Sequence, residues 1–140
     1  MHYVDTSAIV AMLAYEQAGS QIRTALQGKE AEGLMISSWV VTEVSSALSL
    51  KIRTGELTVQ TRAAALAQWQ AIRESSFAEL PVDAEAFYAA ARYAIRHELS
   101  LRAGDALHLA ICAANGCTLV TLDERMAKAA LELGVPVTEI

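Results

Sequence analysis

Residues 118–122, with the sequence Thr-Leu-Val-Thr-Leu, constrain the fold of this chain more than any other segment. A near-continuous apolar strand of this kind is typical of a parallel sheet, where helices cover both faces of the strand. The segment ends at Asp123, and a helical pattern follows over residues 124–133. Other short apolar segments also alternate with helical patterns along the chain. This alternation predicts an α/β sandwich with a mostly parallel sheet.

The element boundaries follow from hydrophobic periodicity and from turn and cap residues. Strands are predicted at residues 1–4, 34–36, 77–82, 118–122 and 135–140. Helices are predicted at residues 8–15, 18–27, 39–53, 59–74, 83–97, 106–114 and 124–133. Ser7 or Thr6 is expected to cap the first helix, and Pro81 favours an edge position for the third strand. The 140 residues contain no linker or repeat, so one domain covering 1–140 is expected.

Composition excludes several classes of protein. The hydrophobic fraction of 54% and the charged fraction of 19% are typical of a packed domain and exclude a disordered chain. No apolar run approaches the roughly 20 residues that span a bilayer, and no basic run precedes the apolar segment 8–14 as it would in a signal peptide. A cytoplasmic protein without a membrane partner is therefore expected. Cys112 and Cys117 match no zinc pattern and are interpreted as reduced thiols.

The net charge of −5 is unfavourable for binding nucleic acid through the whole surface. Contact with a nucleic acid would need a local basic patch, or cations held by the protein. This requirement directs attention to the acidic residues.

Aspartates are scarce, with four in the chain against twelve glutamates, and three of the four can lie at one edge of the predicted sheet. Asp5 and Asp123 come directly after predicted strands, where parallel α/β folds bind their ligands. Asp105 opens a helix, and Glu43 lies in the second turn of the helix that leaves the second strand. Each residue alone could be a helix cap or a solvated charge. Together, the four can share one edge of the sheet.

Four carboxylates that lie close together repel one another and raise each other's pKa. Divalent cations relieve this repulsion, and a ligand set of oxygen atoms alone favours Mg²⁺ or Mn²⁺ over zinc. Two such ions about 4 Å apart are a common arrangement for in-line hydrolysis of phosphodiesters. The acidic residues thus predict metal-dependent hydrolysis without a nucleophilic side chain.

At this point the sequence resembles the PIN-domain ribonucleases, and most of all the VapC toxins of bacterial and archaeal toxin–antitoxin pairs. The resemblance covers essentially the whole chain. The segments that carry it are Asp5-Thr6-Ser7, Glu43, the run Arg-Ala-Gly-Asp-Ala-Leu-His-Leu-Ala at residues 102–110, and Thr121-Leu122-Asp123.

The resemblance implies a five-stranded parallel sheet of order 3-2-1-4-5 with helices on both sides. It implies Mg²⁺- or Mn²⁺-dependent cleavage of single-stranded regions of tRNA, rRNA or mRNA, inhibition of translation, a VapB-like antitoxin and a homodimer. Asp5 and Asp105 match the main metal ligands, and Glu43 and Asp123 match the other two catalytic acids. The supporting hydroxyl residues are Thr6, Ser7 and Thr121.

RNA also needs positive charge near the acidic site. The basic residues expected to supply it are Lys51, Arg53, Arg92, Arg96 and Arg102, of which Arg92 and Arg96 are spaced to project together. His108 shares a helix face with Asp105 and is interpreted as a packed residue beside the site rather than a general acid.

Two alternatives remain open from the sequence. One is a PIN-like scaffold that binds RNA or a partner without cleaving it. The other is a Mg²⁺-dependent phosphatase or receiver-like protein in which Asp5 accepts a phosphoryl group. The second alternative would need a lysine near a strand end, and the sequence places none there.

Overall fold

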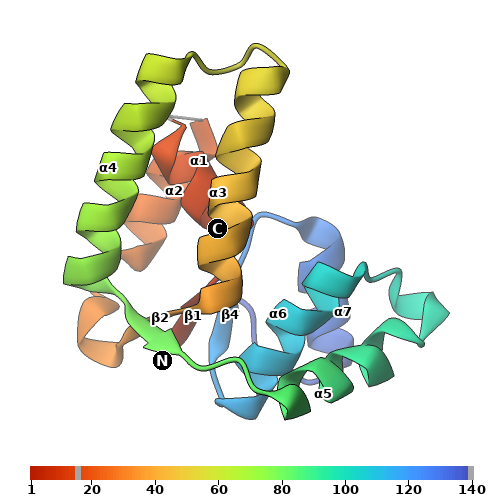
Figure 1. The fold of residues 1–140 in the computed structure, drawn as a ribbon. Helices are drawn as coiled ribbons and strands as arrows, with labels where there is room; N and C mark the ends of the chain where they lie inside the picture. Colours follow the sequence, from red (N-terminus) through yellow and green to blue (C-terminus); the bar gives the residue numbers. More distant parts are fainter. Residues whose placement is uncertain (15–16, 139–140) are drawn as a thin grey trace.

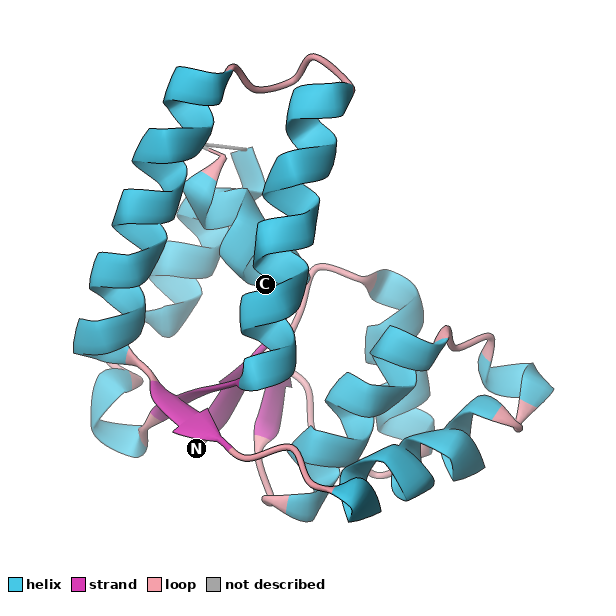
Figure 2. Cartoon of the chain, viewed as in Figure 1, coloured by secondary structure: helices cyan, strands magenta, loops and turns pink. Residues whose placement is uncertain are grey.

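A parallel sheet lies at the centre of the fold. The computed structural model describes residues 1–14 and 17–138, and within them the sheet has four strands in the order β3-β2-β1-β4 (Figure 2). The strands are β1 (His2–Val4), β2 (Leu34–Ser37), β3 (Ala78–Leu80) and β4 (Thr118–Val120). All three neighbouring pairs are parallel. The predicted α/β class and the edge position of the third strand are confirmed.

Helices connect the strands and cover the sheet. They are α1 (Thr6–Leu13), α2 (Gln17–Leu26), α3 (Ser38–Arg53), α4 (Val59–Ser76), α5 (Ala84–Ala94), α6 (Ala103–Ala114) and α7 (Glu124–Glu132), with short 3₁₀ turns at Glu30–Glu32 and His97–Leu99. In Figure 1, α1 to α4 gather above the strands, and α5 to α7 gather below and to the right of them. The long helices α3 and α4 pack against each other, as do α5 and α6.

The predicted fifth strand at 135–140 does not form a strand in the described residues. A single parallel bridge joins Val137 to Leu119 of β4, supported by backbone bonds from Leu119 to Pro136 and from Thr138 to Leu119. Pro136 has no amide hydrogen to donate, which shortens the ladder on this side. The segment still lies beside β4, where a fifth strand in the order 3-2-1-4-5 would lie. Residues 139 and 140 are outside the described part.

Two helices begin two or three residues earlier than the sequence predicts. The first helix begins at Thr6 instead of Ala8, and its cap is Asp5 rather than Ser7 or Thr6, because the Asp5 side chain accepts from the Ala8 amide. The sixth helix begins at Ala103 instead of Ala106. Asp105 therefore lies inside the first turn, where it accepts a bond from the backbone amide of Arg102 at 3.1 Å. The predicted end of the first helix at residue 15 lies outside the described residues.

The core fixes the strand ends that carry the acidic residues. Tyr3 and Val4 of β1 and Val120 of β4 are fully buried, so these strands are covered on both faces. Helix α6 is anchored by Leu107, Ile111 and the other buried residues of its inner face. Within the described part of the chain, every helix is too short or too polar to cross a bilayer.

Candidate active site

An open pocket lies where β1 and β4 end and where α1, α3 and α6 meet. Its volume is about 690 Å³. The four acidic residues that the sequence singled out all line it: Asp5, Glu43, Asp105 and Asp123. They come from segments that are far apart in the sequence. The expectation that these four residues share one edge of the sheet agrees with this geometry.

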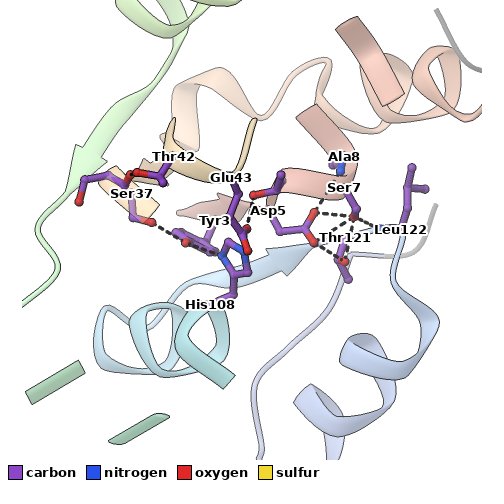
Figure 3. A network of polar contacts seen from close by, with 12 residues as sticks. Tyr3, Asp5, Ser7, Ala8, Ser37, Thr42, Glu43, His108, Thr121 and Leu122 are labelled. Carbon is purple, nitrogen blue, oxygen red and sulfur yellow. Dashed lines mark hydrogen bonds and ion pairs between the residues drawn. The ribbon is translucent and has the colours of Figure 1, made fainter. Parts of the chain in front are cut away.

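Asp5 is the most deeply placed of the four acidic residues, with 2% of its surface exposed. Its carboxylate accepts hydrogen bonds from the Ser7 hydroxyl, which lies 2.8 and 2.9 Å from the two oxygens. The Thr121 hydroxyl donates to Oδ2 at 2.8 Å, and the Ala8 amide donates to Oδ1 at 3.1 Å. Figure 3 shows these bonds converging on Asp5. The predicted supporting hydroxyls of Ser7 and Thr121 thus hold Asp5 in one orientation.

Glu43 is held by two donors on the same oxygen. Its Oε2 accepts from the Thr6 hydroxyl at 2.6 Å and lies 2.7 Å from Nε2 of His108. His108 is 3% exposed, which agrees with its interpretation as a packed residue. Thr6, the third predicted supporting residue, therefore serves Glu43 and not Asp5.

Asp105 and Asp123 are half-buried, as is Glu43, and backbone amides hold their carboxylates. Asp105 Oδ2 bonds to the Arg102 amide. Asp123 caps α7, because its Oδ1 accepts from the amides of Arg125 and Met126 at 2.9 and 3.0 Å. Both carboxylates accept hydrogen bonds from backbone amides at the start of a helix, and both residues line the pocket. The interpretations of these aspartates as helix caps and as site residues are therefore compatible.

The pKa shifts of buried Asp5 and half-buried Glu43 go in opposite directions. Burial raises the pKa of Asp5 above its ordinary value, although the hydrogen bonds from the Ala8 amide and from the Ser7 and Thr121 hydroxyls oppose this. Burial also acts to raise the pKa of Glu43, but the hydrogen bonds from His108 and from the Thr6 hydroxyl oppose it, and the pKa is lowered. The prediction that mutual repulsion raises the pKa of all four acids is wrong for Glu43, because His108 supplies a nearby donor.

Basic residues from two helices also line the acidic pocket: Lys51, Arg53 and Arg102. Lys51 pairs with Glu56 at 2.8 Å. The other two predicted RNA-binding residues do not line this pocket. Arg92 lines a separate cavity beside Asp83 and Asn115, and Arg96 bonds to Glu98 at 2.8 Å. The i, i+4 spacing assumed a helix through residue 97, but α5 ends at Ala94 and Arg96 lies beyond it, so the two side chains do not share a helix face.

Tyr3 and Ser37 belong to the site and were not singled out from the sequence. The Tyr3 hydroxyl lies 2.9 Å from Nδ1 of His108 and 2.8 Å from Oγ of Ser37. A signal was present, because a phenol within an apolar strand must find a hydrogen-bond partner when it is buried. The partner itself depends on the packing of α6 against β1 and could not be read from the sequence.

The donor chemistry of the pocket suits a hard divalent cation. Four carboxylates face one space, and the pKa of Asp5 is raised by burial, so a nearby positive charge would stabilise its ionised form. In the described residues, however, no three His, Cys, Asp or Glu side chains stand close enough together to ligate one ion. Oδ2 of Asp105 accepts from the Arg102 amide, so an ion bound by Asp5 and Asp105 would require these side chains to rearrange.

Residues 2–132 match the family model described as PIN domain. The chain belongs to the PIN domain family. PIN domains are typically nucleases, and PIN nucleases generally use a divalent metal. A comparison with curated proteins found no match.

Solved structures with this PIN fold include toxin–antitoxin proteins. FitAcB from Neisseria gonorrhoeae has a TM-score of 0.74 and 21% identity, over 99% of this chain and 97% of that one. VapC20 from Mycobacterium tuberculosis, described as a sarcin-ricin loop cleaving toxin, has a TM-score of 0.70 and 22% identity, over 92% and 95%. PAE2754 from Pyrobaculum aerophilum has a TM-score of 0.68 and 25% identity, over 98% and 83%. The PIN domain described here is thus structurally close to VapC toxins and FitB.

Proposed function

We propose that this PIN domain is a Mg²⁺- or Mn²⁺-dependent endoribonuclease that cleaves single-stranded regions of RNA. One observation carries the proposal: Asp5, Glu43, Asp105 and Asp123 line a single open pocket at the carboxyl edge of the parallel sheet. The four acids come from distant segments of the chain, and basic residues lie on the wall of the same pocket. Membership of the PIN family supports the same reaction.

The proposed roles follow from the resemblance of these residues to the acidic set of the PIN-domain ribonucleases. Asp5 and Asp105 are the metal ligands, and Glu43 and Asp123 complete the acidic set. Ser7 and Thr121 keep the Asp5 carboxylate in place through their hydroxyl groups. A divalent cation held there supplies Lewis-acid stabilisation of the negative charge that develops on a phosphodiester during hydrolysis.

Positive charge on the pocket wall supports an RNA substrate. Arg102 is exposed at the start of α6, and Arg53 lies in the last turn of α3. Both line the same pocket as the four acids. Guanidinium groups on the wall of this pocket can contact the phosphates on either side of the bond that is cleaved.

The biological setting is proposed from the relatives. VapC20 is a toxin, and similar structures belong to the VapBC family of toxin–antitoxin systems. We therefore expect a small VapB-like antitoxin that inhibits the activity, a homodimer, and inhibition of translation when the chain is produced without its antitoxin. Co-expression with the product of the neighbouring reading frame tests the antitoxin directly.

Cleavage of single-stranded RNA by the purified protein tests the proposed reaction. The wild type should cleave in millimolar Mg²⁺ or Mn²⁺ and stop when EDTA is added. Asp105→Asn is the sharpest variant, because an asparagine oxygen can still accept from the Arg102 amide while the charge is lost. It should keep the fold and lose cleavage. Equal activity in the wild type and Asp105→Asn would mean a contaminating nuclease and a catalytically silent PIN scaffold.

The receiver-like alternative has a separate test. Beryllofluoride mimics a phosphoryl group on an aspartate, so a stable adduct at Asp5 would favour phosphoryl transfer to the protein. The nuclease proposal expects no adduct at Asp5, because its carboxylate is already held by the Ser7 and Thr121 hydroxyls.

A further inference from the structure

A buried chain of hydrogen bonds runs beneath the acidic pocket. It begins at the Ser37 hydroxyl, 2.8 Å from the Tyr3 hydroxyl, which lies 2.9 Å from Nδ1 of His108. Nε2 of His108 lies 2.7 Å from Oε2 of Glu43, which the Thr6 hydroxyl also contacts at 2.6 Å. Figure 3 shows Ser37, Tyr3, His108 and Glu43 in one line. The chain thus connects the interior of the sheet to one of the four acids.

The direction of each bond follows from the groups themselves. Oε2 of Glu43 has two neighbours that can donate, and an ionised carboxylate only accepts, so Nε2 of His108 carries a proton. In a neutral imidazole the other nitrogen, Nδ1, must then accept, and the single proton of the Tyr3 hydroxyl satisfies it. The Ser37 hydroxyl donates in turn to the Tyr3 oxygen. The lowered pKa of Glu43 agrees with an ionised carboxylate at the end of this chain.

Helix stability does not explain this arrangement. Ser37 occupies the N-cap position of α3, where a serine hydroxyl ordinarily accepts from an amide in the first turn of the helix. Its side chain makes no such bond here and faces Tyr3 instead. Tyr3 and Ser37 are fully buried and His108 is nearly so. Three polar side chains are therefore placed in the core in a way that satisfies them only through one another and through Glu43.

We infer that Tyr3 and His108 are positioning residues, which hold the Glu43 carboxylate in one orientation beside the start of α6. The inference rests on the proposed function, because it assigns Glu43 a part in RNA cleavage. Gly104 leaves room for the other oxygen of Glu43, because a Cβ atom at this position would lie only 2.9 Å from Oε1. His108 and Thr6 thus hold Oε2, and Oε1 occupies space that a larger residue at position 104 would take.

His108 acts through Glu43 and not on the substrate. Both of its ring nitrogens are occupied, one by Tyr3 and one by Glu43. Only 3% of the residue is exposed, although it forms part of the pocket floor. A general acid needs an accessible proton within reach of the leaving oxygen, and this geometry does not offer one.

Substitutions at His108 separate positioning from packing. His108→Gln can place an amide donor near the position of Nε2, within reach of Glu43, whereas His108→Asn places its amide near Nδ1 and reaches only Tyr3. His108→Met fills the space without a donor. We expect kcat to fall by about 10- to 100-fold in the Asn and Met variants, with a clearly smaller loss in the Gln variant and little change in the KM for RNA. If the loss of kcat in all three variants simply follows the decrease in their melting temperatures, the role of His108 is merely structural.

The tautomer of His108 gives a readout that does not depend on activity. In metal-free protein with ¹⁵N-labelled histidine, NMR at pH 8 should show His108 as a neutral ring protonated at Nε2. Tyr3→Phe should shift the Nδ1 resonance, because that nitrogen loses its donor, and should lower kcat. A neutral ring protonated at Nδ1, or an imidazolium, would overturn the inference. A wild-type protein that shows the expected tautomer but cleaves no RNA would refute the proposed function and leave the hydrogen-bond chain standing.

Discussion

The hydroxyl of Thr121 donates a 2.8 Å hydrogen bond to Oδ2 of Asp5, across 116 positions of sequence. This bond joins the carboxyl ends of the neighbouring strands β4 and β1. The Ser7 hydroxyl reaches the same carboxylate and also accepts from the Leu122 amide at 2.9 Å. The strand ends are therefore tied together at the acid that we propose as a metal ligand.

Removal of the Ser7 hydroxyl should destabilise the protein. In Ser7→Ala the Leu122 amide loses its acceptor and Asp5 loses a donor, which costs about 1–3 kcal/mol of unfolding free energy. Urea unfolding measures the loss. Ser45→Ala is a matched control, since Ser45 is exposed and bonds only to the Val41 carbonyl, and it should change stability by less than about 0.5 kcal/mol. Equal stability in the two variants would contradict the role given to Ser7.

Asp5→Asn should make the metal-free protein at least as stable as the wild type at neutral pH. Burial raises the pKa of Asp5 in the folded state, so the folded protein retains this proton to a higher pH than the unfolded chain. The stability that Asp5 contributes is full below its unfolded pKa of about 3.9 and is lost as the pH rises through the raised folded value.

Urea unfolding in EDTA between pH 4 and pH 8 tests this prediction for Asp5. The advantage of Asp5→Asn over the wild type should grow with pH, and Mg²⁺ should stabilise only the wild type. If Asp5→Asn is much less stable than the wild type at pH 8, the cap bond to the Ala8 amide dominates and the burial argument fails.

Gly104→Ala should separate stability from activity. Alanine in the first turn of α6 favours the helix by up to about 1 kcal/mol, but its Cβ would lie 2.9 Å from Oε1 of Glu43 and displace that side chain. We expect a small change in melting temperature and a clear loss of RNA cleavage. In a Glu43→Ala background the same substitution should give the full gain in helix stability. Full activity in Gly104→Ala would show that the orientation of Glu43 is unimportant.

The basic residues of the pocket should govern RNA binding, and the basic residues elsewhere should not. In an Asp105→Asn background, which prevents cleavage, Arg53→Ala and Arg102→Ala should weaken binding of a short single-stranded RNA. Each lost phosphate contact should reduce the slope of log Kd against log salt by about 0.7. Arg92→Ala and Arg96→Ala are the controls, as neither residue lines the acidic pocket. If both pairs of substitutions weaken RNA binding equally, the RNA also contacts Arg92 and Arg96, and the pocket residues do not govern binding alone.

The sequence predicted the element order and the acidic pocket because both depend on local signals. A strand that ends directly before Asp5 or Asp123 places that residue at the carboxyl edge of a parallel sheet, whatever the rest of the chain does. A local signal also explains why the sequence placed the start of α6 three residues too late. Asp105 looks like a residue that opens a helix, and only the structure shows its carboxylate reaching back to the Arg102 amide.

The parts that could not be predicted depend on packing between distant elements. Nothing near Tyr3 in the sequence indicates that its hydroxyl lies against His108, because their contact requires α6 to pack against β1. The lowered pKa of Glu43 has the same origin, in a histidine 65 positions away. The shortened pairing at Val137 depends on how the chain turns after α7, and Pro136 alone did not exclude a strand.

The central claim is that the acidic pocket binds a divalent cation through Asp5 and Asp105 for RNA cleavage. Anomalous diffraction from crystals grown or soaked with Mn²⁺ tests it most directly, because it locates the ion without reference to activity. The account predicts a manganese peak in the acidic pocket, ligated by Asp5 and by Asp105 turned away from Arg102, and no peak in Asp5→Asn. A wild-type crystal without manganese in this pocket, at a Mn²⁺ concentration that supports cleavage in solution, would contradict it.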